Sequence, residues 1–163
     1  MYRRVVVGAV MSLSLAGLSY GADPWMGPEW TKKFCDYWNQ NLQTTMAEWA
    51  EYNVKKEKGY KTIQFYRQDC NPPKKVEVRI KYENGKAVCI YGGEAKDPNP
   101  EFVMYATDQN WKSLAKGEFG FMGMGIMSKM TFQGSKVEAM KFMEPFKAFL
   151  LGLGKVPHSD SCP

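Results

Sequence analysis

The chain has 163 residues, a length that suits one domain with a single hydrophobic core. Charged residues make up 24% of it, and the formal net charge is +5. This mild basic excess does not indicate a protein that binds nucleic acid, and the lysine-rich residues 55–61 are typical of a solvated loop. A weak, transient contact with anionic membrane surfaces is compatible with it.

The N-terminus has the pattern of a secretory signal peptide. Arg3 and Arg4 precede an apolar run, and Ser19-Tyr20-Gly21 is a small-x-small cleavage site. A membrane anchor is the alternative, but the run, residues 5–18, is shorter than the roughly 20 residues that span a bilayer. We therefore predict that residues 1–21 are removed during export. Residues 22–163 then form a single periplasmic or secreted domain.

Residues 28–52 predict an amphipathic helix. Pro28 suits the first helical turn, and the apolar residues that follow recur at helical spacing. The Thr44-Thr45 pair is a place where this helix can break into two. The apolar stripe comprises Trp30, Phe34, Tyr37, Trp38, Leu42, Met46 and Trp49.

Four strands are predicted next, at residues 62–67, 76–82, 86–91 and 102–107. The second alternates strictly between apolar and polar residues, which indicates one buried face. Asn84-Gly85 is a strong signal for a type I′ hairpin between the second and third strands.

The C-terminal part predicts a helix, a loop, a fifth strand and a last helix. Thr107 or Asp108 can cap the helix at residues 108–116, and a glycine-rich loop (117–127) leads to the strand at 129–133. Ser135 and Glu138 fit a capping box for the last helix, which Pro145 is expected to kink or split. The fold class is therefore α+β, with about five strands in a sheet covered on one face by helices.

Cys35, Cys70, Cys89 and Cys162 form an even set in a chain with an export signal, so two disulfides are predicted. No C-x-x-C motif supports a redox or zinc site. Three pairings are possible. If the first helix doubles back into the first strand, Cys35 lies about 26 Å from the helix end and Cys70 about 30 Å along the strand. That geometry favours Cys35–Cys70 and leaves Cys89 for Cys162.

This order of elements resembles the type-2 sterol carrier protein family over roughly residues 62–151. Residues 62–65 resemble the family's first strand, residues 80–88 its central hairpin, and residues 102–117 its strand and capped helix. Residues 128–141 resemble the last strand and helix, although Ser128 stands where the family usually has glycine. The resemblance implies a non-catalytic carrier with an apolar tunnel between sheet and helices for sterols, fatty acyl chains or phospholipids.

A cluster of methionine and phenylalanine favours the same interpretation. Seven of the eleven methionines fall within residues 104–143, and methionine side chains adapt to irregular apolar ligands. Four glycines (117, 120, 123 and 125) are compatible with a mobile lid over a cavity, although a filled core is the simpler alternative. The residues expected to bind the ligand are Phe102, Met104, Trp111, Leu114, Phe121, Met124, Met127, Phe132, Met140, Met143 and Phe146.

Catalytic motifs are not apparent. His158 lies beside Ser159, Asp160 and Ser161 in the tail, too close in sequence to assemble a triad, so a solvated tail is expected. The glycines at 120, 123 and 125 lack the Lys-Ser/Thr of a phosphate loop. We therefore expect a monomer that is not an enzyme and needs no cofactor.

Two other functions stay open. Met122, Met124, Met127 and Met130 resemble the thioether-rich strings that bind Cu(I), a soft ion that matches soft sulfur ligands. A structural or partner-binding protein with a filled core is the other. The favoured prediction is an exported carrier of one lipid.

Overall fold

The structure is a computed structural model that describes residues 21–54 and 58–163. The predicted signal peptide, apart from Gly21, and residues 55–57 of the lysine-rich run lie outside these residues. Within the described ranges, no helix is both long and apolar enough to cross a membrane.

A five-stranded sheet with the order β3-β2-β1-β4-β5 forms the centre of the fold. The strands are β1 (Lys61–Arg67), β2 (Val76–Glu83), β3 (Lys86–Glu94), β4 (Phe102–Ala106) and β5 (Thr131–Gln133). β1 pairs parallel with β4, whereas the other neighbours are antiparallel. A parallel pair needs a crossover, and here residues 95–101 return across the sheet: Gln64 donates to the backbone oxygen of Asp97, whose backbone N–H donates to Glu77.

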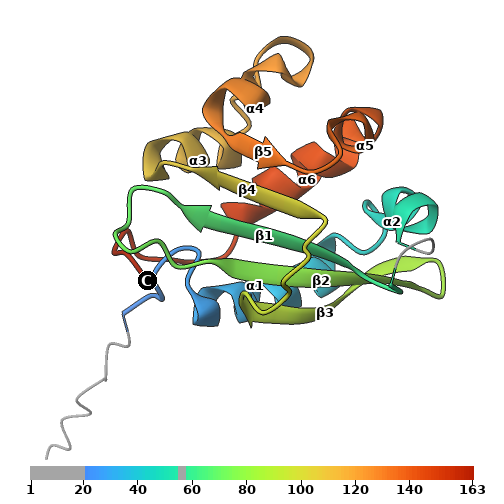
Figure 1. Cartoon of the computed structure of the whole chain (residues 1–163), viewed down its shortest axis with the longest axis horizontal. Coiled ribbons are helices and arrows are strands. Elements are labelled where there is room, and N and C mark those ends of the chain that lie inside the picture. The colour runs from blue at the N-terminus through green and yellow to red at the C-terminus, as the bar shows by residue number, and fades with distance from the viewer. Residues whose placement is uncertain (1–20, 55–57) are drawn as a thin grey trace, which may run out of the picture.

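The larger helices cover the opposite face. Figure 1 shows α1 (Pro28–Asn41) and α6 (Met143–Leu153) behind the sheet, and α2 (Ala47–Asn53) follows α1. α3 (Asp108–Ala115), the short 3₁₀ helix η1 (Phe121–Gly123) and α4 (Met124–Lys129) lie beyond the β4–β5 side. α5 (Lys136–Lys141) connects β5 to α6. The predicted α+β class, with five strands and helices on one face, is confirmed.

Aromatic side chains hold α1 and α6 on the sheet. Phe34 of α1 lies 6.3 Å from Phe65 of β1 and 5.8 Å from Phe149 of α6, measured between ring centroids. Phe65 and Phe149 are 6.0 Å apart, so the three rings close a triangle of edge-to-face contacts. Trp30 and Trp38 extend it along α1 and are fully buried.

The predicted local signals are confirmed at three positions. The first helix breaks between residues 42 and 46, which includes the Thr44-Thr45 pair. Asn84 and Gly85 adopt φ angles of 50° and 75°, as a type I′ turn requires. Thr107 caps α3 by accepting a hydrogen bond from the backbone N–H of Asn110.

Several boundaries differ from the prediction: β3 extends to Glu94 rather than to residue 91, and β5 begins at Thr131 rather than at residue 129. The segment predicted as a loop, residues 117–127, contains η1 and the start of α4, and the positive φ angles of Gly120 and Gly123 allow the chain to turn between them. The last helix breaks at Phe142 rather than at Pro145. Pro145 instead lies in the first turn of α6, where a missing N–H costs no helical hydrogen bond.

The predicted disulfide pairing was wrong. The bridges are Cys35–Cys89 and Cys70–Cys162, with Cα–Cα distances of 5.5 and 5.6 Å. The predicted pairing required α1 to run beside β1, but α1 packs on β3, where the Trp38 indole donates to Ala87 and the Asn39 side chain to Cys89.

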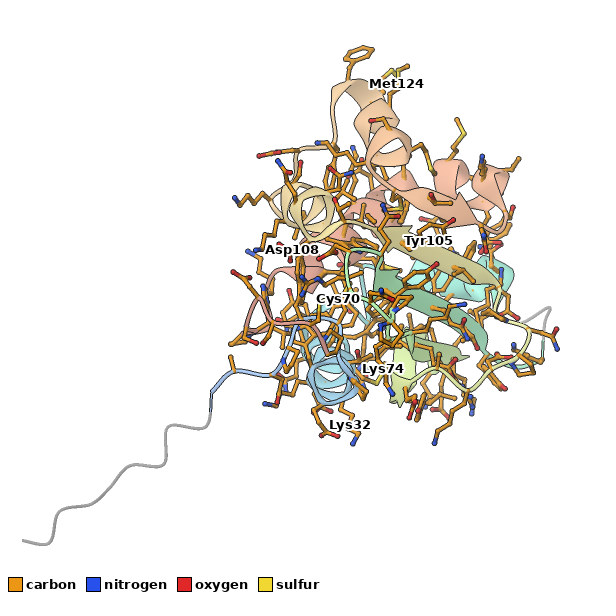
Figure 2. The ribbon with its side chains drawn as sticks, turned by 60° about the vertical axis from the view of Figure 1, so that its left-hand side comes forward. Lys32, Cys70, Lys74, Tyr105, Asp108 and Met124 are labelled. Carbon is orange, nitrogen blue, oxygen red and sulfur yellow. A yellow bond between two sulfur atoms is a disulfide. The ribbon has the colours of Figure 1, made fainter. Side chains whose placement is uncertain are left out.

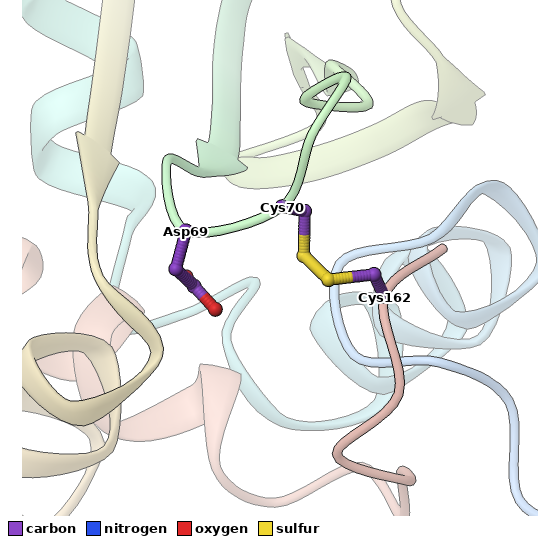
Figure 3. Close-up of side chains that lie close together, drawn as sticks. All are labelled: Asp69, Cys70 and Cys162. Carbon is purple, nitrogen blue, oxygen red and sulfur yellow. A yellow bond between two sulfur atoms is a disulfide. The ribbon is translucent and has the colours of Figure 1, made fainter.

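The C-terminal tail has exposed residues at 160–163, as expected for a solvated tail, but several contacts tie it to the domain. Figure 3 shows Cys70 joined to Cys162 with Asp69 beside them. Both sulfurs are in the bridge, so this cluster offers no thiolate for a metal. The Arg67 guanidinium donates to the backbone oxygens of residues 160 and 161. The imidazole of His158 stacks on Trp25 at 4.5 Å, which gives the sole histidine a structural contact.

Removing either bridge should destabilise the fold, because each closes a long loop of 54 or 92 residues in the unfolded chain. We expect the free energy of unfolding to fall by about 2–4 kcal/mol in Cys35→Ser/Cys89→Ser and in Cys70→Ser/Cys162→Ser. Denaturant titration measures this. Peptide mapping without reduction should recover both observed pairs, and a Cys35–Cys70 peptide would contradict the structure.

The crossing segment should give the fold an acid-sensitive contact. Burial acts to raise the pKa of Asp97, but hydrogen bonds from Lys58 and Thr62 outweigh it and lower this pKa to about 2. The contribution of the Asp97 carboxylate to folding stability is complete above the unfolded pKa of about 3.9 and is lost as the pH falls toward 2. Thermal unfolding should show that the wild type's advantage over Asp97→Asn shrinks in this window. A constant difference would contradict it.

Candidate functional site

An apolar pocket lies between the sheet and the helices α2, α5 and α6. Its volume is about 40 Å³. The lining residues are Met46, Trp49, Ile63, Phe102, Met104, Phe132, Glu138, Ala139, Phe142, Pro145, Phe146 and Phe149.

The floor of the pocket follows from strand register. Ile63 of β1 is opposite Phe102 of β4, and Met104 of β4 is opposite Phe132 of β5. Alternate residues of a strand point to the same face, so these four side chains project together toward the helices. Phe132 contacts both Phe102 and, at a centroid distance of 5.7 Å, Phe146 of α6. Three strands and one helix therefore position the apolar surface.

One carboxylate interrupts this apolar lining. Glu138 of α5 accepts a hydrogen bond of 2.8 Å from the Trp49 indole and two of 2.7 Å from the Lys61 ammonium. The side chains of Lys61 and Glu138 are only 5% and 12% exposed. Ser135 caps the helix as predicted, since its hydroxyl accepts from the N–H of Glu138. The carboxylate, however, reaches across the pocket to β1 and α2.

The structure separates the predicted ligand-binding residues into three groups. Phe102, Met104, Phe132 and Phe146 line the pocket. Trp111 and Leu114 are fully buried elsewhere, and Met127 and Met143 are half-buried outside it. Phe121, Met124 and Met140 are exposed, at 80%, 73% and 67%, and are not among the lining residues.

Several lining residues were absent from the prediction. Met46 and Trp49 belong to the apolar stripe of the first predicted helix, and Phe142 and Phe149 are apolar residues at helical spacing in the last predicted helix, so periodicity could have suggested all four. Ile63 lies in an expected strand, residues 62–67. Glu138 had no such signal, because its partners Trp49 and Lys61 are 89 and 77 residues away.

The cover of the pocket comes from α5. This helix contributes Glu138 and Ala139 to the lining, whereas the glycine-rich segment expected as a lid contributes none of the lining residues. That segment instead packs on the molecule through Ile126, which is fully buried, and through Gly123, which lies against Met143.

The model of the SCP-2 sterol transfer family matches residues 38–147, more than half of the chain. The chain belongs to this family. Its fold is similar to a crystal structure of sterol carrier protein 2, with a TM-score of 0.56 at 12% identity over 81% of this chain and 98% of that one. It is also similar to the solution structure of a conserved Thermus thermophilus protein suggested to be a sterol carrier protein. That comparison has a TM-score of 0.55 at 13% identity and covers 86% and 97% of the two chains.

No curated protein sequence matches the chain. Membership of the SCP-2 sterol transfer family confirms the resemblance of the sequence, and the family match begins within α1, ahead of the first strand where the resemblance began. The tunnel that the resemblance implied remains a prediction, since the structure has a small pocket at the corresponding interface of sheet and helices.

The ion pair of Lys61 and Glu138 at the pocket should make the fold sensitive to single substitutions of either residue. Glu138→Ala leaves a buried ammonium without its carboxylate, so the free energy of unfolding should fall by about 3–5 kcal/mol. Replacing both groups, in Lys61→Met/Glu138→Met, should recover most of this loss because no unpaired charge remains. Urea unfolding measures both variants. Additive losses in the double variant would contradict a coupled pair.

Proposed function

We propose that this member of the family is an exported, non-catalytic carrier that binds one lipid in the pocket between the sheet and the helices α5 and α6. The observation that carries this proposal is the composition of the pocket, whose lining is apolar except for Glu138. Membership of the SCP-2 sterol transfer family supports binding of an apolar ligand.

Ligand binding requires the pocket to widen. Sites for small molecules generally have volumes of roughly 300–1,000 Å³, far above the 40 Å³ of this pocket. α5 is the element suited to move. It has six residues and lies between Gly134, with a φ angle of 129°, and the break at Phe142. Outward movement of α5 removes one wall of the pocket and leaves the strands and α6 in place.

The binding energy comes from burying hydrocarbon. Each CH₂ group transferred from water into the pocket contributes about 0.8 kcal/mol. Affinity should therefore rise with chain length until the widened cavity is full.

Export of the protein is part of the proposal. Two disulfides fit an oxidising compartment such as the periplasm or the exterior of the cell, and they agree with the signal-like N-terminal sequence.

Membrane contact gives the lipid a route into the protein. Phe121, Met122 and Met124 are all largely exposed on η1 and α4, and Figure 2 shows Met124 at the outer end of this segment. Residues 112–147 contain six lysines and three glutamates, so this part of the sequence has a net positive charge. This tip, residues 121–124, docks on an anionic bilayer, with its apolar side chains in the interface and lysines near the lipid phosphates.

Lipid extraction from purified protein, read by native mass spectrometry, tests the carrier function. We expect a co-purified acyl or sterol species, and fatty alcohols of increasing length should bind with increasing affinity and change the fluorescence of Trp49. Trp49→Phe is the control for the optical signal. If the folded protein binds no lipid, the carrier function is contradicted and the alternative of a structural protein with a filled core is favoured. Tight Cu(I) binding lost in Met122→Leu/Met124→Leu would favour the metal-binding alternative.

Vesicle flotation tests the membrane contact. The wild type should float with vesicles that contain anionic lipid, and Phe121→Ser/Met124→Ser should reduce the bound fraction at least about fivefold because two inserted side chains are lost. Ile90→Ser is the matched control, because Ile90 is a half-exposed apolar residue on β3, the opposite edge of the sheet. An equal loss of vesicle binding in both variants would contradict a membrane contact through the tip.

A further inference from the structure

Two hydrogen-bond donors at the pocket form an anion-binding arrangement. The Lys61 ammonium and the Trp49 indole N–H converge on one carboxylate, with donor–acceptor distances of 2.7 and 2.8 Å. Both donors belong to well-packed elements, since Lys61 begins β1 and Trp49 is buried in α2. Charged hydrogen bonds in such a poorly solvated position are among the stronger polar contacts in proteins.

The acceptor of these hydrogen bonds, Glu138, belongs to α5, the helix that covers the pocket. Glu138 and Ala139 turn inward from α5, whereas Val137 and Met140 are exposed on its outer side. Little apolar area therefore holds α5 down, and the contacts of Glu138 with Lys61 and Trp49 act as its latch.

The anion-binding donors are continuous with the apolar floor. The Lys61 ammonium lies 5.3 Å from the ring centroid of Phe102, and Phe102 lines the pocket together with Ile63, its partner in the neighbouring strand. A molecule whose negative head group met Lys61 would therefore extend its hydrocarbon directly over Phe102 and Ile63.

We propose that Glu138 occupies, within the chain itself, the position of a ligand's anionic head group. The ligand is an amphiphile with a carboxylate or phosphate head, which replaces Glu138 on Lys61 and Trp49 while its hydrocarbon fills the space that α5 vacates. This inference rests on the proposed carrier function and names the ligand class of the same pocket.

The exchange keeps every buried charge paired. An anionic head leaves Lys61 with a counter-ion, and Glu138 moves with α5 toward solvent, where a carboxylate is well hydrated. A neutral lipid that opened α5 would instead leave the Lys61 ammonium buried without a partner, which is unfavourable. Lys61 thus selects for negative head groups, and Glu138 competes with them.

Two ligands of equal chain length isolate the head group. Calorimetry with hexadecanoate and 1-hexadecanol should show that the wild type prefers the acid by roughly tenfold or more, the range expected for a charged hydrogen bond. Hexadecyl phosphate, in a third arm, distinguishes a phosphate-selective from a carboxylate-selective site.

Variants of the pair test each partner's role. Glu138→Gln removes the competing charge and should raise the affinity for hexadecanoate by roughly tenfold, with little effect on 1-hexadecanol. Lys61→Met should abolish the preference for the acid, and Lys61→Arg should retain it. Lys61→Met/Glu138→Gln, which leaves no unpaired charge, keeps the test valid if Lys61→Met alone fails to fold.

The outcomes separate this inference from the carrier function. If the wild type binds both ligands equally and the variants leave that ratio unchanged, the anionic-ligand inference is overturned while the carrier function stands. If the folded wild type binds none of the three amphiphiles, both proposals are overturned. A preference for the acid that Lys61→Met leaves intact also overturns the role of Lys61.

Discussion

β1 is the strand on which the rest of the structure depends, because successive residues of its inner face serve three purposes. Lys61, Ile63 and Phe65 are alternate residues of the strand, so all three point toward the helices. Lys61 binds the carboxylate of Glu138, Ile63 is part of the pocket floor, and Phe65 packs in the aromatic triangle with Phe34 and Phe149. The spacing of two residues that defines a strand thus places a polar donor, an apolar surface and a rigid core in one line.

The outer face of β1 fixes the connection that makes this arrangement possible. The side chains of Thr62 and Gln64 donate to Asp97 in the crossing segment, so residues 95–101 are held over the sheet. Glu77, fully buried beside them, is neutralised by Arg79 and accepts from Gln64 and from the N–H of Asp97. Because the crossover uses this face, the opposite face is free to carry α1, α2, α5 and α6 and the pocket beneath them.

The sequence predicted those parts of the fold that depend on local signals. The alternation in β2 and the turn at Asn84-Gly85 identify the hairpin regardless of the rest of the chain. Thr107 caps α3 through a hydrogen bond to a residue only three positions further on. The disulfides were mispaired because their connectivity depends on which strand α1 packs against, and no local pattern carries that information. The breakpoint of the last helix was placed three residues late, since Pro145 is tolerated in a first helical turn.

The residues of the candidate site also divide into those that local sequence patterns predict and those that they do not. Phe132 and Phe146 could be predicted because their own strand and helix periodicity indicates a buried face. Phe121 and Met124 could not be placed correctly, since an apolar glycine-rich segment has the same composition whether it covers a cavity or projects from the surface. Glu138 was explained by the local capping box with Ser135, so nothing in the sequence required a further partner. Its contact with Lys61 arises only when β1 and α5 are brought together.

The break at Phe142 gives the two C-terminal helices different mechanical properties. α6 is anchored by Phe149, Leu150 and Leu153, which are buried in the core, so its displacement would disrupt the aromatic triangle. α5 has two inward side chains and an exposed outer surface, so its displacement breaks mainly the contacts of Glu138. A buried ion pair contributes little net stability compared with apolar packing of the same volume. The same pair can therefore close the pocket without making it costly to open, provided that the ligand supplies a replacement for the carboxylate.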